Sequence, residues 1–138
     1  HLLIYELSIT SGYNAASLRE RIYSDSDEID MTGTLIFTGS NDSDGTLGGL
    51  ARMAEPELLA PIISQAIKRG EWCASDPLCI DGILSTSETK NIAACHSCVL
   101  TPETSCEHQN AFLDRALIVG TPENPKLGFF HDILRKIE

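Results

Sequence analysis

The chain has few aromatic residues, few positive charges and no long apolar run. Aromatic side chains make up 6% of its 138 residues, and ten Lys and Arg stand against twenty Asp and Glu, which gives a net charge of -10. Nucleic-acid binding depends on Lys and Arg to neutralise phosphates, and single-strand binding adds stacking aromatic side chains. The composition therefore disfavours direct DNA binding, and any basic surface would have to come from a partner.

Long apolar stretches are also missing. No run approaches the roughly eighteen apolar residues that indicate a transmembrane helix. The apolar fraction of 42% is that of an ordinary globular chain. We therefore expect no membrane association and a cytoplasmic protein.

The sequence lacks the short motifs that carry common enzyme chemistry. No serine occurs in the G-x-S-x-G context of a hydrolase nucleophile, and no Walker or helicase motif is present. The glycine-rich stretch 39–50 follows a predicted strand but contains neither G-K-[ST] nor G-x-G-x-x-G, and Asp42 and Asp44 would repel a phosphate. We interpret this stretch as a structural turn. Because the enzyme motifs are missing, we also expect the chain to have no catalytic activity.

Cysteine is absent from most of the chain and concentrated in one part of it. All five cysteines lie between residues 73 and 106, and two of them, Cys95 and Cys98, have the C-x2-C spacing of a zinc knuckle. Two thiolates at that spacing can reach one metal ion at about 2.3 Å each. Cys73 and Cys79 form an upstream pair. Four thiolates close a tetrahedral structural zinc site and leave one cysteine over.

The spacing alone leaves the fourth ligand open. Cys95, Cys98 and Cys79 are the first choices, and Cys73 and Cys106 compete for the remaining position. Two histidines in the same region offer nitrogen ligands, but a histidine beside a thiolate ligand is more often a neighbour of the metal site than part of it. These histidines are His96 and His108.

Other uses of the cysteines are less consistent with the sequence. Random placement would rarely confine ordinary buried cysteines to a quarter of the chain, and an odd number without a secretory signal argues against a disulfide framework. A thiol oxidoreductase using Cys95 and Cys98 is the main alternative, together with a zinc enzyme that keeps an open coordination position. The redox pair would need a helix after Cys95, and Pro102 interrupts one.

Periodicity predicts a helix-rich chain with a short sheet. We expect the acidic segment 24–30 and the polar segment 80–92 to be loops. Residues 34–38 (T-L-I-F-T), bounded by Gly33 and Gly39, are predicted to be a strand. Asn14 is the expected N-cap of residues 15–23, where Ser17 and Glu20 also have capping-box spacing, and Thr104 with Glu107 forms a capping box before 105–119. The predicted helices cover residues 1–10, with Gly12 as the stop, 15–23, 56–69, with Pro56 at the first position, 105–119 and a short segment from Leu127. Apolar residues at helical spacing predict the inner faces of two of them. These are Leu58, Leu59, Ile62, Ile63, Ala66 and Ile67 in 56–69, and Phe112, Leu113, Ala116 and Leu117 in 105–119.

The predicted fold class is α/β of the α+β type, a small helix-rich domain with a short sheet and a structural zinc site of four cysteines. We expect one zinc-binding domain over residues 1–120 and a C-terminal amphipathic extension over 121–138. The sequence begins with His1, which is followed directly by an apolar run (L-L-I-Y). We therefore expect it to be an N-terminally truncated fragment of a larger protein.

Three cysteine-containing stretches occur together in a combination that is more specific than any one of them. They are 72–79 (W-C-A-S-D-P-L-C), 94–98 (A-C-H-S-C) and 102–107 (P-E-T-S-C-E). With 12–23, 34–50 and 110–116, they resemble the MrfA-type zinc-binding domain family, in the form found in DrmB-like proteins of the DISARM anti-phage defence system. The resemblance covers residues 1 to about 119.

The resemblance implies a ligand set and a setting. The cysteines that match the widely shared positions are Cys73, Cys79, Cys95 and Cys98, with Cys106 as the alternative fourth ligand. It implies a bound Zn2+ and a non-catalytic accessory domain in a defence complex. The implied partners are a helicase subunit or other domains of the parent protein, with DNA engaged only through the complex.

Overall fold

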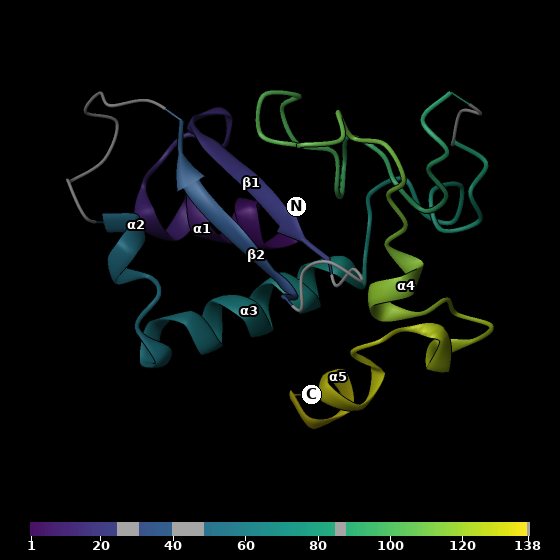
Figure 1. The fold of residues 1–138 in the computed structure, drawn as a ribbon. Helices are drawn as coiled ribbons and strands as arrows, with labels where there is room; N and C mark the ends of the chain where they lie inside the picture. The colour runs from purple at the N-terminus through teal and green to yellow at the C-terminus, as the bar shows by residue number, and fades with distance from the viewer. Residues whose placement is uncertain (25–30, 40–48, 85–87, 138) are drawn as a thin grey trace.

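The computed structural model describes residues 1–24, 31–39, 49–84 and 88–137 (Figure 1). Its helices and its two-stranded antiparallel sheet confirm the mixed α+β class. The elements in chain order are α1 (Leu2–Ser11), β1 (Leu18–Tyr23), β2 (Gly33–Thr38), α2 (Gly49–Arg52), α3 (Pro56–Gly70), α4 (Ala116–Val119) and α5 (His131–Ile137). Short 3-10 turns occupy Ala15–Ser17 and Pro125–Leu127. No helix among the described residues is long and apolar enough to cross a membrane.

The N-terminal half is built on α1, which packs along α3 and beneath the β1–β2 hairpin (Figure 1). Its core consists of Ile4, Leu7, Leu18 and Ile62, with Ile36 of β2 packed against them. The two strands pair in register from Leu18 opposite Thr38 to Tyr23 opposite Gly33. The sequence thus predicted α1 and β2 correctly.

Helix α1 ends where the sequence predicts, at Gly12. This residue has φ of 78°, in the left-handed region, and its N–H donates to the carbonyl of Ser8. A Cβ at Gly12 would meet no atom within 4 Å, so only the backbone conformation opposes a side chain there. Glycine adopts this conformation without the steric cost that other residues bear.

Replacing Gly12 with alanine should therefore destabilise the chain by about 1–2 kcal/mol, the cost of left-handed backbone for a residue with a Cβ. Chemical denaturation measures the change. Gly33→Ala is the matched control, because a Cβ there also meets nothing within 4 Å and the backbone is not left-handed. The control should stay within about 0.5 kcal/mol of the parent, and equal effects of the two variants would contradict the backbone explanation.

Helix α3 was predicted closely. Pro56 occupies its first turn, and the helix continues through Pro61. Of the apolar residues expected on its inner face, Ile62, Ala66 and Ile67 are buried, whereas Ile63 is 38% exposed. Leu58 and Leu59 are half-buried. The helix therefore delivers Trp72 and Cys73 into the cysteine region from a firmly packed base.

The predicted helix over 15–23 is wrong. Asn14 does cap a turn, accepting a hydrogen bond from the N–H of Ala16, but that turn is a 3-10 turn of three residues. Leu18 then begins β1, where Leu18, Glu20 and Ile22 share one face at a spacing of two; Leu18 is buried, Glu20 half-buried and Ile22 exposed. Leu18 and Ile22 are four residues apart, a spacing that puts two side chains on one face of either a helix or a strand. Pairing with β2 decides for the strand.

The predicted helix over 105–119 is also wrong for most of its length. Only α4 is helical, and the preceding segment has positive φ at Gln109, Asn110 and Phe112. Its polar side chains are used elsewhere: Ser105 donates its hydroxyl to the carbonyl of Ala15, and Glu107 accepts from the N–H of Ile22. Long-range contacts to the hairpin thus replace the predicted capping box.

Two of the four apolar residues expected on the inner face of that segment are exposed. Phe112 is 66% exposed and Leu117 is 54% exposed, whereas Ala116 is buried. Leu113 is half-buried. The described residues from 72 to 115 contain no helix and no strand, so the predicted loop over 80–92 is confirmed where the structure describes it.

The C-terminal segment forms a helix, α5, that begins at His131 and not at Leu127. It packs against α3 and α4, with Leu134 buried (Figure 1). The expectations for the acidic segment 24–30 and the glycine-rich stretch 39–50 fall mostly outside the described residues.

Candidate metal centre

Four cysteine side chains from two separate turns converge at one point. The Sγ atoms of Cys73, Cys79, Cys95 and Cys98 all lie within 4.8 Å of one another. Cys73, Cys79 and Cys98 are buried and Cys95 is partly exposed. They form the centre of a core cluster with Ala94 and Val99. The structure therefore brings together four of the five cysteines, the same four that the family resemblance implies as ligands.

The spacing of these sulfur atoms suits a tetrahedral metal ion. Sγ of Cys73 is 3.4 Å from that of Cys95, and Sγ of Cys98 is 3.6 Å from that of Cys79 and 3.7 Å from that of Cys95. Four sulfurs placed about 2.3 Å from a central Zn2+ would lie about 3.8 Å apart. A disulfide needs about 2.05 Å, and all five cysteines are free. The cluster is thus consistent with zinc.

The remaining predicted ligands lie apart from this cluster. Cys106 is buried but belongs to a different group of side chains, with His1 and Glu20. His96 and His108 are exposed. Neither histidine is among the residues whose ligand atoms converge with the four sulfurs.

The cysteine turns are held by Asp76, which lies between Cys73 and Cys79. Its Oδ2 accepts a hydrogen bond of 2.9 Å from the N–H of Cys73, and its Oδ1 accepts one of 3.1 Å from the N–H of Ile80. A carboxylate that accepts two backbone hydrogen bonds fixes the turn geometry at both ends. Asp76 therefore sets where the first pair of thiols points.

Asp76 is in turn paired with a buried arginine, Arg115. The guanidinium Nη2 lies 2.6 Å from Asp76 Oδ1, and Nη1 donates to the carbonyl of Gly70 at 2.9 Å. Arg115 is 1% exposed. It thus links the end of α3, the first cysteine turn and the start of α4. A cation at this place also offsets part of the roughly two negative charges of a zinc ion with four thiolates.

The thiols differ in acidity. Burial raises the pKa of Cys98 to about 11, and burial together with the neighbouring Cys98 raises the pKa of Cys79 well above its ordinary value. Burial acts the same way on Cys95, but hydrogen bonds from the Cys73 thiol and the Ser97 N–H outweigh it and lower its pKa to about 7. Binding of a cation to this cluster therefore has to be accompanied by proton release.

Sequence reasoning found the four cysteines but missed Asp76 and Arg115 as their supports. A signal existed for Asp76, because an Asp three residues after Cys73 is placed to accept the N–H of that turn. No comparable signal existed for Arg115. Its role depends on the fold that brings residue 115 next to residue 76.

The four converging thiols lie in a part of the chain that a known family shares. The sequence matches the MrfA Zn-binding domain over residues 1–99. The chain belongs to this family. The MrfA Zn-binding domain match includes all four clustered cysteines and leaves out Cys106.

A curated relative extends the match beyond residue 99. The chain is 40% identical over 134 residues to the "DISARM protein DrmB" of Bacillus paralicheniformis (strain ATCC 9945a / NCIMB 11709 / CD-2). The match covers 97% of this chain but only 23% of that protein. The chain thus spans about a quarter of the length of the relative.

Proposed function

We propose that this chain is a non-catalytic, zinc-stabilised accessory domain of a DISARM-type anti-phage defence protein, with Zn2+ held by Cys73, Cys79, Cys95 and Cys98. The observation that carries the proposal is the convergence of these four thiols within 4.8 Å of one another. Four protein ligands fill a tetrahedral zinc and leave no position for a substrate. The zinc therefore acts as a structural cross-link.

We propose residues 1–120 as the zinc-binding domain and 121–138 as an extension of it, within a longer parent protein. The relative is more than four times as long as the matched region, so further domains are expected around it. Several large apolar side chains are exposed, among them Phe129 at 82% and Trp72 at 71%. Exposed aromatic side chains are typical of contact surfaces. We expect them to contact other domains or a helicase subunit in the cytoplasm.

DNA is expected to be reached through that complex. The net charge of -10 opposes contact between this chain and phosphates. The partner or the rest of the parent protein must therefore supply the cationic surface. A helicase is the partner class that would engage DNA and hydrolyse ATP, since the chain has no Walker motif.

In the full-length protein, Cys79→Ser should abolish both phage defence and co-purification with the helicase subunit, because the accessory surface depends on the zinc cross-link. Plaque counts and affinity purification measure the two effects. His96→Ala is the matched control, because His96 is exposed within the Cys95–Cys98 turn and outside the sulfur cluster. The control should keep both properties, and a fully defending Cys79→Ser protein would contradict the proposal.

The alternative is a thiol oxidoreductase or zinc enzyme that uses Cys95 and Cys98. One observation favours it, the partial exposure of Cys95. The sulfur of Cys95, however, is as close to Cys73 as to Cys98, at 3.4 Å and 3.7 Å, which is the arrangement of a shared metal and not of an isolated dithiol. Rapid alkylation of Cys95 in the zinc-loaded protein would favour the enzyme.

A further inference from the structure

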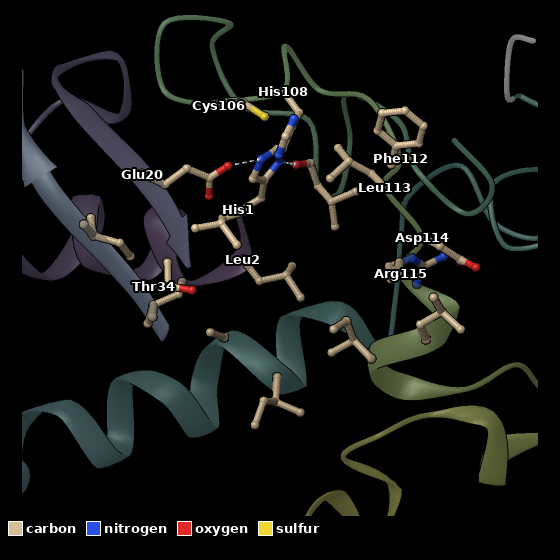
Figure 2. A pocket seen from close by; sticks show the side chains of 18 of the residues that line it. His1, Leu2, Glu20, Thr34, Cys106, His108, Phe112, Leu113, Asp114 and Arg115 are labelled. Carbon is tan, nitrogen blue, oxygen red and sulfur yellow. Dashed lines mark hydrogen bonds and ion pairs between the residues drawn. The ribbon is translucent and has the colours of Figure 1, made fainter. Parts of the chain in front are cut away.

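The fifth cysteine lies in a second cluster of metal-ligating side chains. The ligand atoms of His1, Glu20 and Cys106 all lie within 4.8 Å of one another. Their side chains are buried or nearly so: His1 is 7% exposed, Glu20 6%, and the Cys106 residue 8%. Figure 2 shows the three side chains facing one another from three separate segments of the chain.

The backbone brings these segments together. The N–H of Glu20 in β1 donates to the carbonyl of Ser105 at 3.1 Å, which places Cys106 beside the strand. His1 precedes α1, and its Nδ1 lies 2.8 Å from the carbonyl of Val99 (Figure 2). The cluster therefore joins the N-terminal half to the end of the cysteine region.

The contacts of His1 determine which nitrogen faces the cluster. The carbonyl of Val99 can only accept a hydrogen bond, so Nδ1 carries a proton and donates it. Nε2 then points at Oε1 of Glu20, 3.2 Å away. In the neutral ring this nitrogen has a lone pair, which a carboxylate oxygen repels, so either a proton or a metal ion has to lie between the two atoms. A backbone carbonyl on the distal nitrogen is also the usual arrangement of a metal-ligating histidine.

One contact of Cys106 suits a thiolate ligand. The N–H of Asn110 points at its sulfur at 3.2 Å, an interaction that stabilises negative charge on sulfur. For tetrahedral zinc, a nitrogen and an oxygen ligand would lie about 3.4 Å apart, close to the 3.2 Å between His1 and Glu20. One nitrogen, one oxygen and one sulfur form a donor set suited to borderline divalent ions such as Zn2+ and Co2+.

We propose that His1 Nε2, the Glu20 carboxylate and the Cys106 thiolate form a second site for a divalent transition-metal ion, with Zn2+ as its expected ion. Three protein ligands leave one coordination position free, as in zinc sites that bind an exchangeable fourth ligand. The three residues line one end of a cavity of about 750 Å3 whose other lining residues are mostly apolar, including Leu2, Ile36 and Phe112. The proposed site therefore borders an apolar cavity.

A cysteine nucleophile activated by His1 explains the same residues less well. A general base must offer a nitrogen to the thiol. Here Nδ1 is taken by Val99 and Nε2 faces Glu20. A metal-free ion pair between His1 and Glu20 is the other explanation, and it predicts no second metal ion.

Metal counting on the full chain separates these explanations. The chain is prepared with its α-amino group blocked, because a free amine beside an imidazole would bind metal adventitiously. After equilibration with Co2+ and gel filtration, we expect two ions per chain: one with the absorption of four thiolates, and one with the weaker charge-transfer absorption of a single thiolate. One ion per chain would overturn the proposal, whatever the variants show.

Variants assign the second ion to its ligands. Glu20→Gln preserves the shape of the side chain, and Cys106→Ser leaves the four clustered cysteines intact. Each substitution should lower the affinity for the second ion by about 100-fold or more, without changing the four-thiolate absorption. That absorption also reports folding in each variant. Retention of two tightly bound ions by folded Glu20→Gln and Cys106→Ser chains would overturn the proposal.

Glu107→Gln is the matched control for Glu20→Gln. Glu107 is a neighbouring carboxylate that pairs with Arg21 at 2.8 Å and lies outside the cluster. The Glu107→Gln chain should bind two ions, as the parent chain does. Loss of the second ion in this control alone would assign the ion to a different carboxylate and overturn the ligand set.

Discussion

Removal of zinc from the four-cysteine cluster should unfold the cysteine region and lower the stability of the whole chain by several kcal/mol. The described residues from 72 to 115 contain neither helix nor strand, so turns and isolated hydrogen bonds hold them instead of regular secondary structure. Structural zinc sites supply apparent binding energies of about 10–16 kcal/mol in small peptides. A metal that joins the two cysteine turns is thus a large stabilising contribution to this region.

The packing of the region leads to the same expectation. Three of the five buried residues in its core cluster are Cys73, Cys79 and Cys98 themselves. These are small side chains that bury little apolar surface. Without the metal the cluster would lose its cross-link and keep only a small core, together with buried thiols that have no strong partners.

Thermal unfolding followed by circular dichroism, with and without a chelator, measures this effect. We expect chelation or Cys98→Ser to remove the cooperative transition of the cysteine region, and added Zn2+ to restore it in the chelated parent only. Ser97→Ala, an exposed change between two of the cysteines, is the control and should behave as the parent does. An unchanged melting temperature after complete zinc removal would contradict a structural role for the metal.

Arg115→Met should destabilise the chain by about 3–5 kcal/mol, the usual effect of removing one partner of a buried ion pair. The side chain of Arg115 is 0% exposed and that of Asp76 is 21% exposed, so the pair is largely shielded from water. Loss of the guanidinium leaves the carboxylate without its cation, while Asp76 still has to hold the N–H groups of Cys73 and Ile80. We also expect zinc affinity to fall by about 10–100-fold.

Chemical denaturation and a zinc competition assay give the two quantities. Arg21→Met is the matched control, because Arg21 pairs with Glu107 at the surface, with 61% of its side chain exposed. Exposed pairs contribute about 0–1 kcal/mol. A second comparison uses Asp76→Asn, alone and with Arg115→Met. If the two residues act as a pair, the double variant should lose less than the sum of the single variants.

The sequence predictions were accurate where an element depends on neighbouring residues, and they failed where it depends on residues far away along the chain. Gly12, Pro56 and the glycines around β2 act on neighbouring residues, and the elements that they mark were predicted well. The two failed helices, over 15–23 and 105–119, contact each other: Ser105 and Glu107 bond to Ala15, Glu20 and Ile22. Each segment takes its shape from a partner about 85–90 residues away. Local patterns do not encode such a partner.

The same distinction applies to the candidate site. The C-x2-C spacing and the confinement of the cysteines to residues 73–106 indicated a metal cluster before any fold was known. The spacing left open which cysteine stands apart, and the family resemblance implied Cys106. In the structure Cys106 lies beside Glu20 and His1, away from the other four. The buried pair of Asp76 and Arg115 likewise depends on a contact across 39 residues.

The start of α1 is tied to the far end of the cysteine region. His1 contacts the carbonyl of Val99 across 98 residues, and the hydroxyl of Tyr5 donates to the carbonyl of Leu100 across 95 residues. A ribosome adds about 5–20 residues per second. During synthesis, these two side chains therefore wait about 5–20 s for their acceptors to be made. Helix α1 therefore completes these two contacts only after most of the cysteine region has been synthesised.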